Sequence, residues 1–165
     1  MNHPSVPHHN PMANVHTFLE VGALSSSITR FIVDCCCCNE KQSNTLDFST
    51  WKSIKEIEIG SHSFQYVTGV DIVGLSQLER VVIGRNCFSQ EPVLSDEGVI
   101  PHFAVKDCER LKELRIGRKS FCYYGICDID NNASLRVIEM GKMGEDGGLF
   151  INGILKIMST LYLGE

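Results

Sequence analysis

Four consecutive cysteines, Cys35 to Cys38, are the densest group of reactive side chains in the sequence. Thiolates bind soft metals and exchange with disulfides, so the run suggests a metal or redox site. Successive side chains of an extended chain point in different directions, however, so four in a row cannot close one tetrahedral site unaided. No further Cys-x-x-Cys pair follows in the sequence. The competing interpretation is that part of the run packs in a core, where thiols behave as small apolar groups.

Histidines are a second source of metal ligands. Four of the six lie near the N-terminus: His3, His8, His9 and His16. Such a tail can bind a divalent metal weakly, but its Pro and Asn residues are more typical of a leader, and we interpret residues 1–17 as disordered or loosely packed. His62 and His102 are expected in turns, without Cys, Asp or Glu at ligand spacing. We therefore predict no metal and no cofactor.

Sequence motifs for catalysis are missing. The chain has no Gly-x-Ser-x-Gly elbow, no Walker loop, no His-Glu-x-x-His and no dinucleotide fingerprint. The acidic, glycine-rich segment 144–148 lacks the Lys, Ser or Thr of a phosphate cradle and the spacing of a calcium loop. No set of residues nominates an active site, and we expect a protein that is not an enzyme.

Composition limits the partners and the location. The chain has 165 residues, is 43% hydrophobic and carries a formal net charge of -5, which fits one folded domain and disfavours nucleic acid or an anionic membrane as a partner. No apolar stretch approaches the roughly 20 residues that span a bilayer, and the N-terminus lacks the apolar segment of a signal peptide. We therefore expect a cytoplasmic protein whose eight cysteines are free thiols.

A repeated segment dominates the organisation of the chain. Four copies have apolar residues at offsets 0, +3 and +5 and Gly at offset +6, and they begin at Ile54, Leu78, Leu111 and Leu135. Degenerate copies begin at Ile28 and Met158, which makes six. Offset +10 is phenylalanine in three copies: Phe64, Phe88 and Phe121. Self-similarity at a fixed period is typical of repeat architectures.

A second apolar pair precedes the next copy each time: Leu46/Phe48, Val70/Ile72, Phe103/Val105, Cys127/Ile129 and Leu149/Ile151. The glycine at +6 recurs after 24 residues from Gly60 to Gly84 and from Gly117 to Gly141, but after 33 residues from Gly84 to Gly117. The whole excess falls within the segment that follows Phe88, so we place an insertion loop at about 90–101.

The repeat has a direct physical interpretation. Alternating apolar residues at +3 and +5 fit a short strand with one buried face. Because a unit of 24 residues cannot bury that face alone, the units must stack into a parallel sheet with one strand per repeat. The Gly suits either a turn with positive φ or a close backbone approach. The Phe then fills the interior, and the second apolar pair lines the opposite wall.

The copy that begins at Leu78 resembles the leucine-rich-repeat family, whose consensus is Leu-x-x-Leu-x-Leu-x-x-Asn/Cys-x-Leu. All five consensus positions are occupied in it, by Leu78, Val81, Ile83, Asn86 and Phe88. The copies at Ile54 and Leu111 match four of the five, with His62 and Lys119 in place of Asn, so a continuous asparagine ladder is not expected. The Gly, the Phe and the second apolar pair are similar to the divergent repeats of bacterial and protist surface proteins.

This resemblance implies a β-rich, right-handed solenoid of about six repeats, with few or no helices, over residues 18–165. In its register Cys36 takes the Asn/Cys position and Cys38 the Phe position, so both are expected to point inward, with Cys35 and Cys37 more exposed. Other cysteines that fall in apolar columns are interpreted as packing residues: Cys87, Cys108 and Cys127.

Charged residues occupy the strand offsets expected to face water, +1, +2 and +4: Lys55, Glu56, Glu58, Glu79, Arg80, Lys112, Glu113, Arg115, Arg136 and Glu139. Neighbouring strands then place opposite charges side by side, as in Glu56–Arg80–Glu113 and Arg115–Glu139. Repeat proteins commonly bind partners on such extended faces, although a merely solvated sheet needs the same polar residues. We take this set as a candidate partner-binding face.

The insertion is a second candidate surface. Its candidate binding residues are Glu91, Leu94, Asp96 and Glu97, because insertions in repeat proteins often map to binding loops. The alternative is an insertion tolerated only because lengthening a loop costs little entropy.

These features predict a non-catalytic scaffold for protein–protein interaction. An alternative is a structural, self-assembling repeat module or a fragment of a longer repeat protein, in which the C-terminal repeat stacks end to end on another copy. A weaker alternative is a carbohydrate-binding β-solenoid, which needs carboxylates clustered on one face in neighbouring rungs. The strand columns alternate in sign instead.

Overall fold

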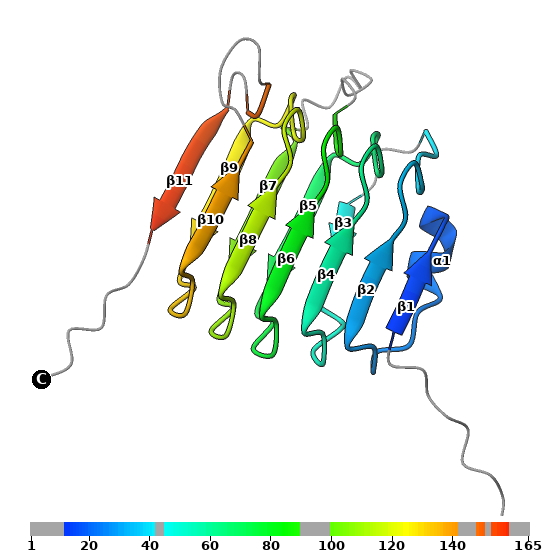
Figure 1. Ribbon diagram of the computed structural model, residues 1–165, viewed down its shortest axis with the longest axis horizontal. Helices are drawn as coiled ribbons and strands as arrows, with labels where there is room; N and C mark the ends of the chain where they lie inside the picture. The colour runs from blue at the N-terminus through cyan, green and yellow to red at the C-terminus, as the bar shows by residue number, and fades with distance from the viewer. Residues whose placement is uncertain (1–11, 42–44, 90–99, 142–147, 151–152, 159–165) are drawn as a thin grey trace, which may run out of the picture.

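A computed structural model describes residues 12–41, 45–89, 100–141, 148–150 and 153–158. These residues form eleven strands and one short helix (Figure 1). The helix and strands, in chain order, are β1 (Met12–Val15), α1 (Phe18–Gly22), β2 (Arg30–Val33), β3 (Thr45–Asp47), β4 (Glu56–Ile59), β5 (Gly69–Val73), β6 (Arg80–Ile83), β7 (His102–Lys106), β8 (Glu113–Ile116), β9 (Ile126–Asp130), β10 (Val137–Met140) and β11 (Ile154–Met158). Within this part of the chain, no helix has the length and apolar character to cross a membrane.

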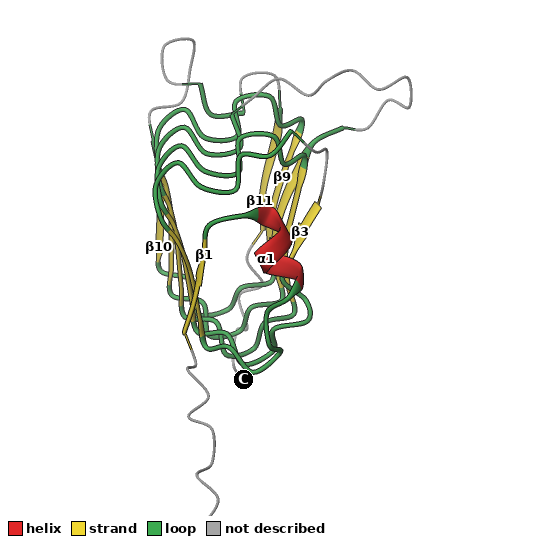
Figure 2. Cartoon of the chain, turned by 90° about the vertical axis from the view of Figure 1, so that its right-hand side faces the viewer, coloured by secondary structure: helices red, strands yellow, loops and turns green. Residues whose placement is uncertain are grey.

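The strands form two parallel sheets that face each other (Figure 2). The first sheet has the order β1-β2-β4-β6-β8-β10, and the second has the order β11-β9-β7-β5-β3. From β2 onward the chain alternates between the sheets, so each unit contributes two strands. The expectation of one strand per repeat is therefore wrong. The second apolar pair is itself a strand, because residues two apart face the same side and pair with the same positions of the next unit.

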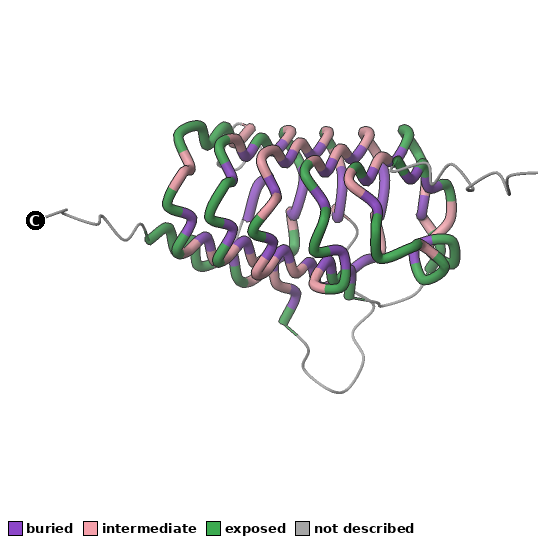
Figure 3. Tube along the Cα trace, turned by 90° about the horizontal axis from the view of Figure 1, so that it is seen from below, coloured by how far each residue is buried: buried purple, intermediate pink, exposed green. Residues whose placement is uncertain are grey.

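The core lies between the sheets and runs through all the units (Figure 3). In-register pairing places residues of the same offset side by side, as Ile57, Val81 and Leu114 show, and all three are fully buried. The rings of Phe64 and Phe88 stack with centroids 5.7 Å apart, and those of Phe88 and Phe121 with centroids 4.7 Å apart. We call this line of stacked rings the phenylalanine column. It confirms the interior position predicted for offset +10.

The phenylalanine column also includes Phe150, whose ring stacks on Phe121 at 5.6 Å. Of the pair Leu149/Ile151, predicted to line the opposite wall, Leu149 is buried and Ile151 lies outside the described residues. On the second sheet, the positions next to Cys127 and Ile129 of β9 belong to Leu155 and Ile157 of β11. Met158, predicted to begin a degenerate copy, instead ends a strand of the second sheet, and the rest of that copy lies outside the described residues.

The turns after β2, β4, β6 and β8 use left-handed backbone at two residues each. The residues at +8 and +10 have positive φ in successive units, including 53° at both Asn86 and Phe88, 60° at Lys119 and 56° at Phe121. This conformation costs an L-residue on the order of 1–3 kcal/mol. Complete burial of the aromatic side chain offsets the cost at +10.

The glycines at +6 serve close packing rather than an unusual turn. None of the four has positive φ. A Cβ atom built on Gly117 would lie 2.5 Å from the backbone N of Arg85 and 2.5 Å from the backbone C of Gly84, and Gly141 is similarly crowded by Arg118. The turn of one unit therefore rests directly on the glycine of the next. Of the two roles predicted for this glycine, the close approach is the one that the structure contains.

The first sheet begins before the predicted repeats. Met12–Val15, expected within the leader of residues 1–17, form β1, and Ala13 and Val15 are buried in line with Phe31 and Val33 of β2. Helix α1 follows, stabilised at its N-terminus by a capping box between Thr17 and Glu20. In Figure 2 this helix stands beside β3, at the end of the second sheet. A short apolar stretch can thus join a sheet without matching the full repeat.

Candidate functional site: the charged outer face of the first sheet

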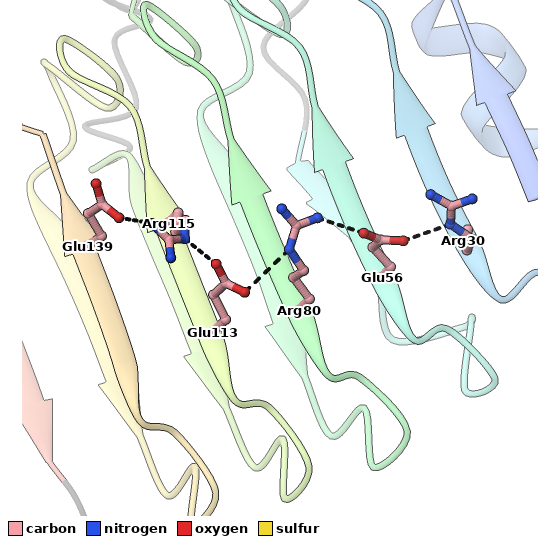
Figure 4. Close-up of polar contacts among 6 residues, drawn as sticks. All are labelled: Arg30, Glu56, Arg80, Glu113, Arg115 and Glu139. Atoms are coloured by element: carbon pink, nitrogen blue, oxygen red, sulfur yellow. Dashed lines mark hydrogen bonds and ion pairs between the residues drawn. The ribbon is translucent and has the colours of Figure 1, made fainter.

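A chain of ion pairs crosses the outer face of the first sheet (Figure 4). Glu56 accepts hydrogen bonds from Arg30 Nε at 2.7 Å and from Arg80 Nη1 at 2.7 Å. Arg80 Nε lies 3.4 Å from Glu113 Oε2, and Arg115 bridges Glu113 to Glu139. This series of ion pairs reaches from β2 to β10. We call it the charge ladder, and its residues are Arg30, Glu56, Arg80, Glu113, Arg115 and Glu139.

The parallel register creates the charge ladder. Residues at +2 in β2, β4, β6 and β8 are direct neighbours, and they alternate in sign: Arg30, Glu56, Arg80 and Glu113. Arg115 and Glu139 are neighbours at +4. The predicted neighbours Glu56–Arg80–Glu113 and Arg115–Glu139 therefore do lie together. Arg30 was missed, although its +2 offset in the degenerate first copy carried the signal.

The ion pairs perturb the carboxylates. Hydrogen bonds from Arg115 lower the pKa of Glu113. Partial burial alone would raise the pKa of Glu56, but the hydrogen bonds from Arg80 and Arg30 outweigh it, and the pKa is lowered. Exposed pairs contribute only about 0–1 kcal/mol each to stability. The main effect of the charge ladder is to hold long side chains in fixed rows.

The other predicted face residues lie beside the charge ladder. Lys112 Nζ is 2.9 Å from Glu79 Oε2, and this contact lowers the pKa of Glu79. Lys55 and Arg136 are exposed and Glu58 is half-buried. A shallow groove of about 380 Å³ opens at the start of β4 and β6, and it is lined by Thr29, Arg30, Lys55, Glu56, Glu79 and Arg80. The predicted loop residues Glu91, Leu94, Asp96 and Glu97 lie outside the described residues.

The outer face of the second sheet carries contacts that the sequence did not reveal. His102 lies in strand β7, not in the predicted turn, and its Nε2 is 3.2 Å from Asp71 Oδ1. Lys106 forms an ion pair with Asp128. Asp47 and Asp71 are direct neighbours across β3 and β5, but Asp47 accepts hydrogen bonds from the backbone and hydroxyl of Ser49. These carboxylates are engaged in structural contacts.

Inside the turns, serine and cysteine at offset +9 form a hydrogen-bond ladder in place of the asparagine ladder. Ser120 Oγ donates to the Gly84 carbonyl at 2.7 Å and accepts from the Cys87 N–H at 3.0 Å. Ser63 donates to the Asp34 carbonyl at 2.9 Å, and the Cys87 thiol lies 3.2 Å from the Gly60 carbonyl. Each side chain satisfies backbone groups of the preceding unit, which are buried and need partners. These residues are structural.

The cysteine run divides between the surface and the core. Cys35 and Cys36 are exposed, Cys37 is half-buried and Cys38 is buried. The prediction that Cys36 points inward is wrong, because its side chain is exposed. Burial raises the pKa of Cys38 to about 12. His16 Nδ1 lies 3.8 Å from the Cys37 thiol, yet no described His, Cys, Asp and Glu side chains form a group of three that could hold a metal.

Thiol titration should separate these cysteines. In the folded protein we expect Cys35 and Cys36 to react rapidly with an aromatic disulfide reagent, because both are exposed. Cys38, Cys87 and Cys127 should react only on unfolding, because burial raises their pKa to about 12, 11 and 12. The Cys36→Ser variant should lose one fast thiol and the Cys38→Ser variant none. Rapid loss of a thiol that depends on Cys38 would contradict the described packing.

Comparisons with known proteins give no relatives for this chain. No protein-family model, curated protein or solved structure matches it. The candidate site therefore rests on the geometry of the chain's own residues, in the charge ladder with its adjoining groove.

Proposed function

We propose that this protein is a non-catalytic scaffold that binds a partner protein on the outer face of its first sheet. The observation that carries the proposal is the charge ladder, which fixes alternating charges in a row across five strands. A partner segment with the complementary alternation would be selected and oriented by these charges. The groove beside Lys55 and Glu79 gives such a segment a place to enter.

The supporting argument is preorganisation. The strands under the charge ladder are paired on both sides from β2 to β8, and a filled core lies beneath them. Arginine side chains already held by carboxylates lose less conformational freedom when a partner binds. These properties suit the face to recognition of a protein surface.

The binding face is tested by changing its charges together. The Arg80→Gln, Glu113→Gln, Arg115→Gln triple variant should bind a captured partner at least about tenfold more weakly, a loss of about 1.4 kcal/mol. The partner is first captured from a cell extract with the unmodified chain, then purified, and its Kd is measured by calorimetry.

The matched control changes residues on and beside the second sheet: Asp71 lies in β5, Lys106 lies in β7, and Lys52 lies in the turn after β3. Like the first-sheet variant, the Lys52→Gln, Asp71→Asn, Lys106→Gln variant removes two positive charges and one negative charge. It should bind the partner with the same Kd as the unmodified chain. Equal binding by the first-sheet variant and the unmodified chain, or an equal loss in both variants, would refute the proposed face.

We further propose that the units are divergent leucine-rich repeats wound into a right-handed solenoid. In support, the apolar residues of the repeat recur in register across the first sheet, and the phenylalanine column runs inside the turns. An experimental structure that resolves the hand of the connections between the sheets would test this.

A cytoplasmic location is part of the same proposal. All eight cysteines are free, including two that are exposed, and free exposed thiols persist in a reducing compartment. Imaging of a fluorescently tagged full chain in cells would test the location.

A further inference from the structure

Most of the exposed apolar side chains lie toward the two ends of the stacked sheets. Of the large hydrophobic residues that are exposed in the described chain, two lie at the β1 end: Met12 on β1 and Leu19 on α1. The others gather in the half that ends in β10 and β11: Ile100, Tyr123, Ile126, Val137, Ile138, Ile154, Leu155, Ile157 and Met158. Apolar patches of this kind mark surfaces that another molecule covers.

At the β10 end, two side chains at inward-facing positions are exposed to solvent. Ile138 is 39% exposed and Ile157 is 47% exposed, whereas their in-register neighbours Leu114 and Ile129 are at most 1% exposed. Among the described strands, none pairs with the outer edge of β10 or of β11. Both edges therefore present backbone N–H and C=O groups beside uncovered apolar side chains, which is a template for a further strand.

The β1 end of the stacked sheets carries apolar residues in the same columns as those exposed at the β10 end. β1 is the outermost described strand of the first sheet at this end, and Met12 is 39% exposed. Through the register of the first sheet, Met12 belongs to the same column as Val137, and Ala13 to the same column as Ile138. Beside β1 stands α1, which carries the exposed Leu19.

We infer that the chain stacks head to tail on a second copy of itself, with β10 of one copy pairing in parallel with β1 of the next. In the register used throughout the sheet, Val137 would meet the second copy's Met12, an apolar pair. Glu139, which has one arginine partner in its own chain, would meet Asn14, whose amide can donate a hydrogen bond. No like charges meet along this edge.

The same stacking covers the β11 end of the second sheet. Leu155 and Ile157 of β11 would face α1 of the next copy, where Leu19 is 86% exposed. A two-fold arrangement that pairs β10 with β10 would leave Met12 and Leu19 uncovered, so the head-to-tail arrangement accounts for more of the exposed apolar surface. A head-to-tail contact does not close on itself and builds open chains of copies. It engages only the terminal Glu139 of the charge ladder, and it does not depend on the proposed binding function.

Sedimentation velocity over a concentration series tests the inference. The unmodified chain, of 18.4 kDa, should reach a weight-average mass above that of a dimer. An Ile138→Lys, Ile157→Lys variant should stay monomeric, and so should a Met12→Lys, Leu19→Lys variant. Mixed together, the two variants should form a one-to-one dimer and nothing larger, because each keeps one intact end.

The control is Val73→Glu, a charge placed on the outer face of the second sheet beside Lys106, which should assemble like the unmodified chain. Circular dichroism verifies that each variant is folded. A strictly monomeric unmodified chain at every concentration would overturn the inference without reference to any variant. It would also be overturned if the Met12→Lys, Leu19→Lys variant still formed a dimer by itself, since that result indicates two-fold pairing of β10 edges.

Discussion

The Phe88→Ala variant is expected to lose about 3–5 kcal/mol of its free energy of unfolding. Phe88 is fully buried and stacks between Phe64 and Phe121 in the phenylalanine column. Its removal leaves a cavity whose walls belong to three successive units. The strain of its left-handed backbone, with φ of 53°, remains after the ring that compensated for it has gone.

Urea unfolding measures this loss. Far-ultraviolet circular dichroism reports the sheets, and fluorescence of the single tryptophan, the buried Trp51, reports the neighbouring core. The control is Tyr123→Ala, which removes an exposed aromatic ring and should change the free energy of unfolding by no more than about 0.5 kcal/mol. A loss below about 1 kcal/mol at Phe88 would show that the phenylalanine column does not hold the units together.

The second large loss in the free energy of unfolding is expected in the Gly117→Ala variant. An alanine there would place its Cβ atom 2.5 Å from backbone atoms of both Gly84 and Arg85. Backbone cannot swing aside as a flexible side chain can, so neighbouring units must separate locally. We expect a loss of about 1–3 kcal/mol in the free energy of unfolding, toward the upper end of the range for overpacking.

The matched control for this variant is Gly22→Ala. Gly22 lies in α1 and a Cβ atom there meets nothing within 4 Å, so alanine should be neutral or should stabilise the protein by up to about 1 kcal/mol. Both variants make the same chemical change, and chemical denaturation compares them directly. If Gly117→Ala were as stable as Gly22→Ala, close contact between units would not be the reason for glycine at +6.

Sequence reasoning succeeded where a residue's role depends on spacing within one unit. Ile57, Val81 and Leu114 are buried at +3, and Phe88 at +10, as the periodicity predicts. The two-residue alternation that identified the first strand is equally present in the second apolar pair. It was interpreted as a wall rather than a strand because a single unit does not show that successive pairs hydrogen-bond to one another.

The wrong predictions share a cause. Each concerns a residue whose structure depends on what lies next to its unit. Met12–Val15 match the repeat poorly, yet they form a strand because β2 offers a free edge. Phe150 enters the phenylalanine column although its distance from Gly141 differs from that of the other units. The consensus predicts an inward Cys36, but the side chain is exposed, because a consensus position does not fix what surrounds the residue in the first unit.

By itself, the sequence determined the repeating unit: which offsets are apolar, where glycine must stand, and that charges of alternating sign occupy the strand positions left for water. These are local consequences of strand geometry and burial. Only the tertiary structure decided which charges meet, because all but one of the ion pairs of the charge ladder join residues about one unit apart, and they need the parallel register that brings Arg30 beside Glu56. It also decided which apolar residues stay uncovered, since exposure at Ile138 depends on whether another strand follows β10 in space.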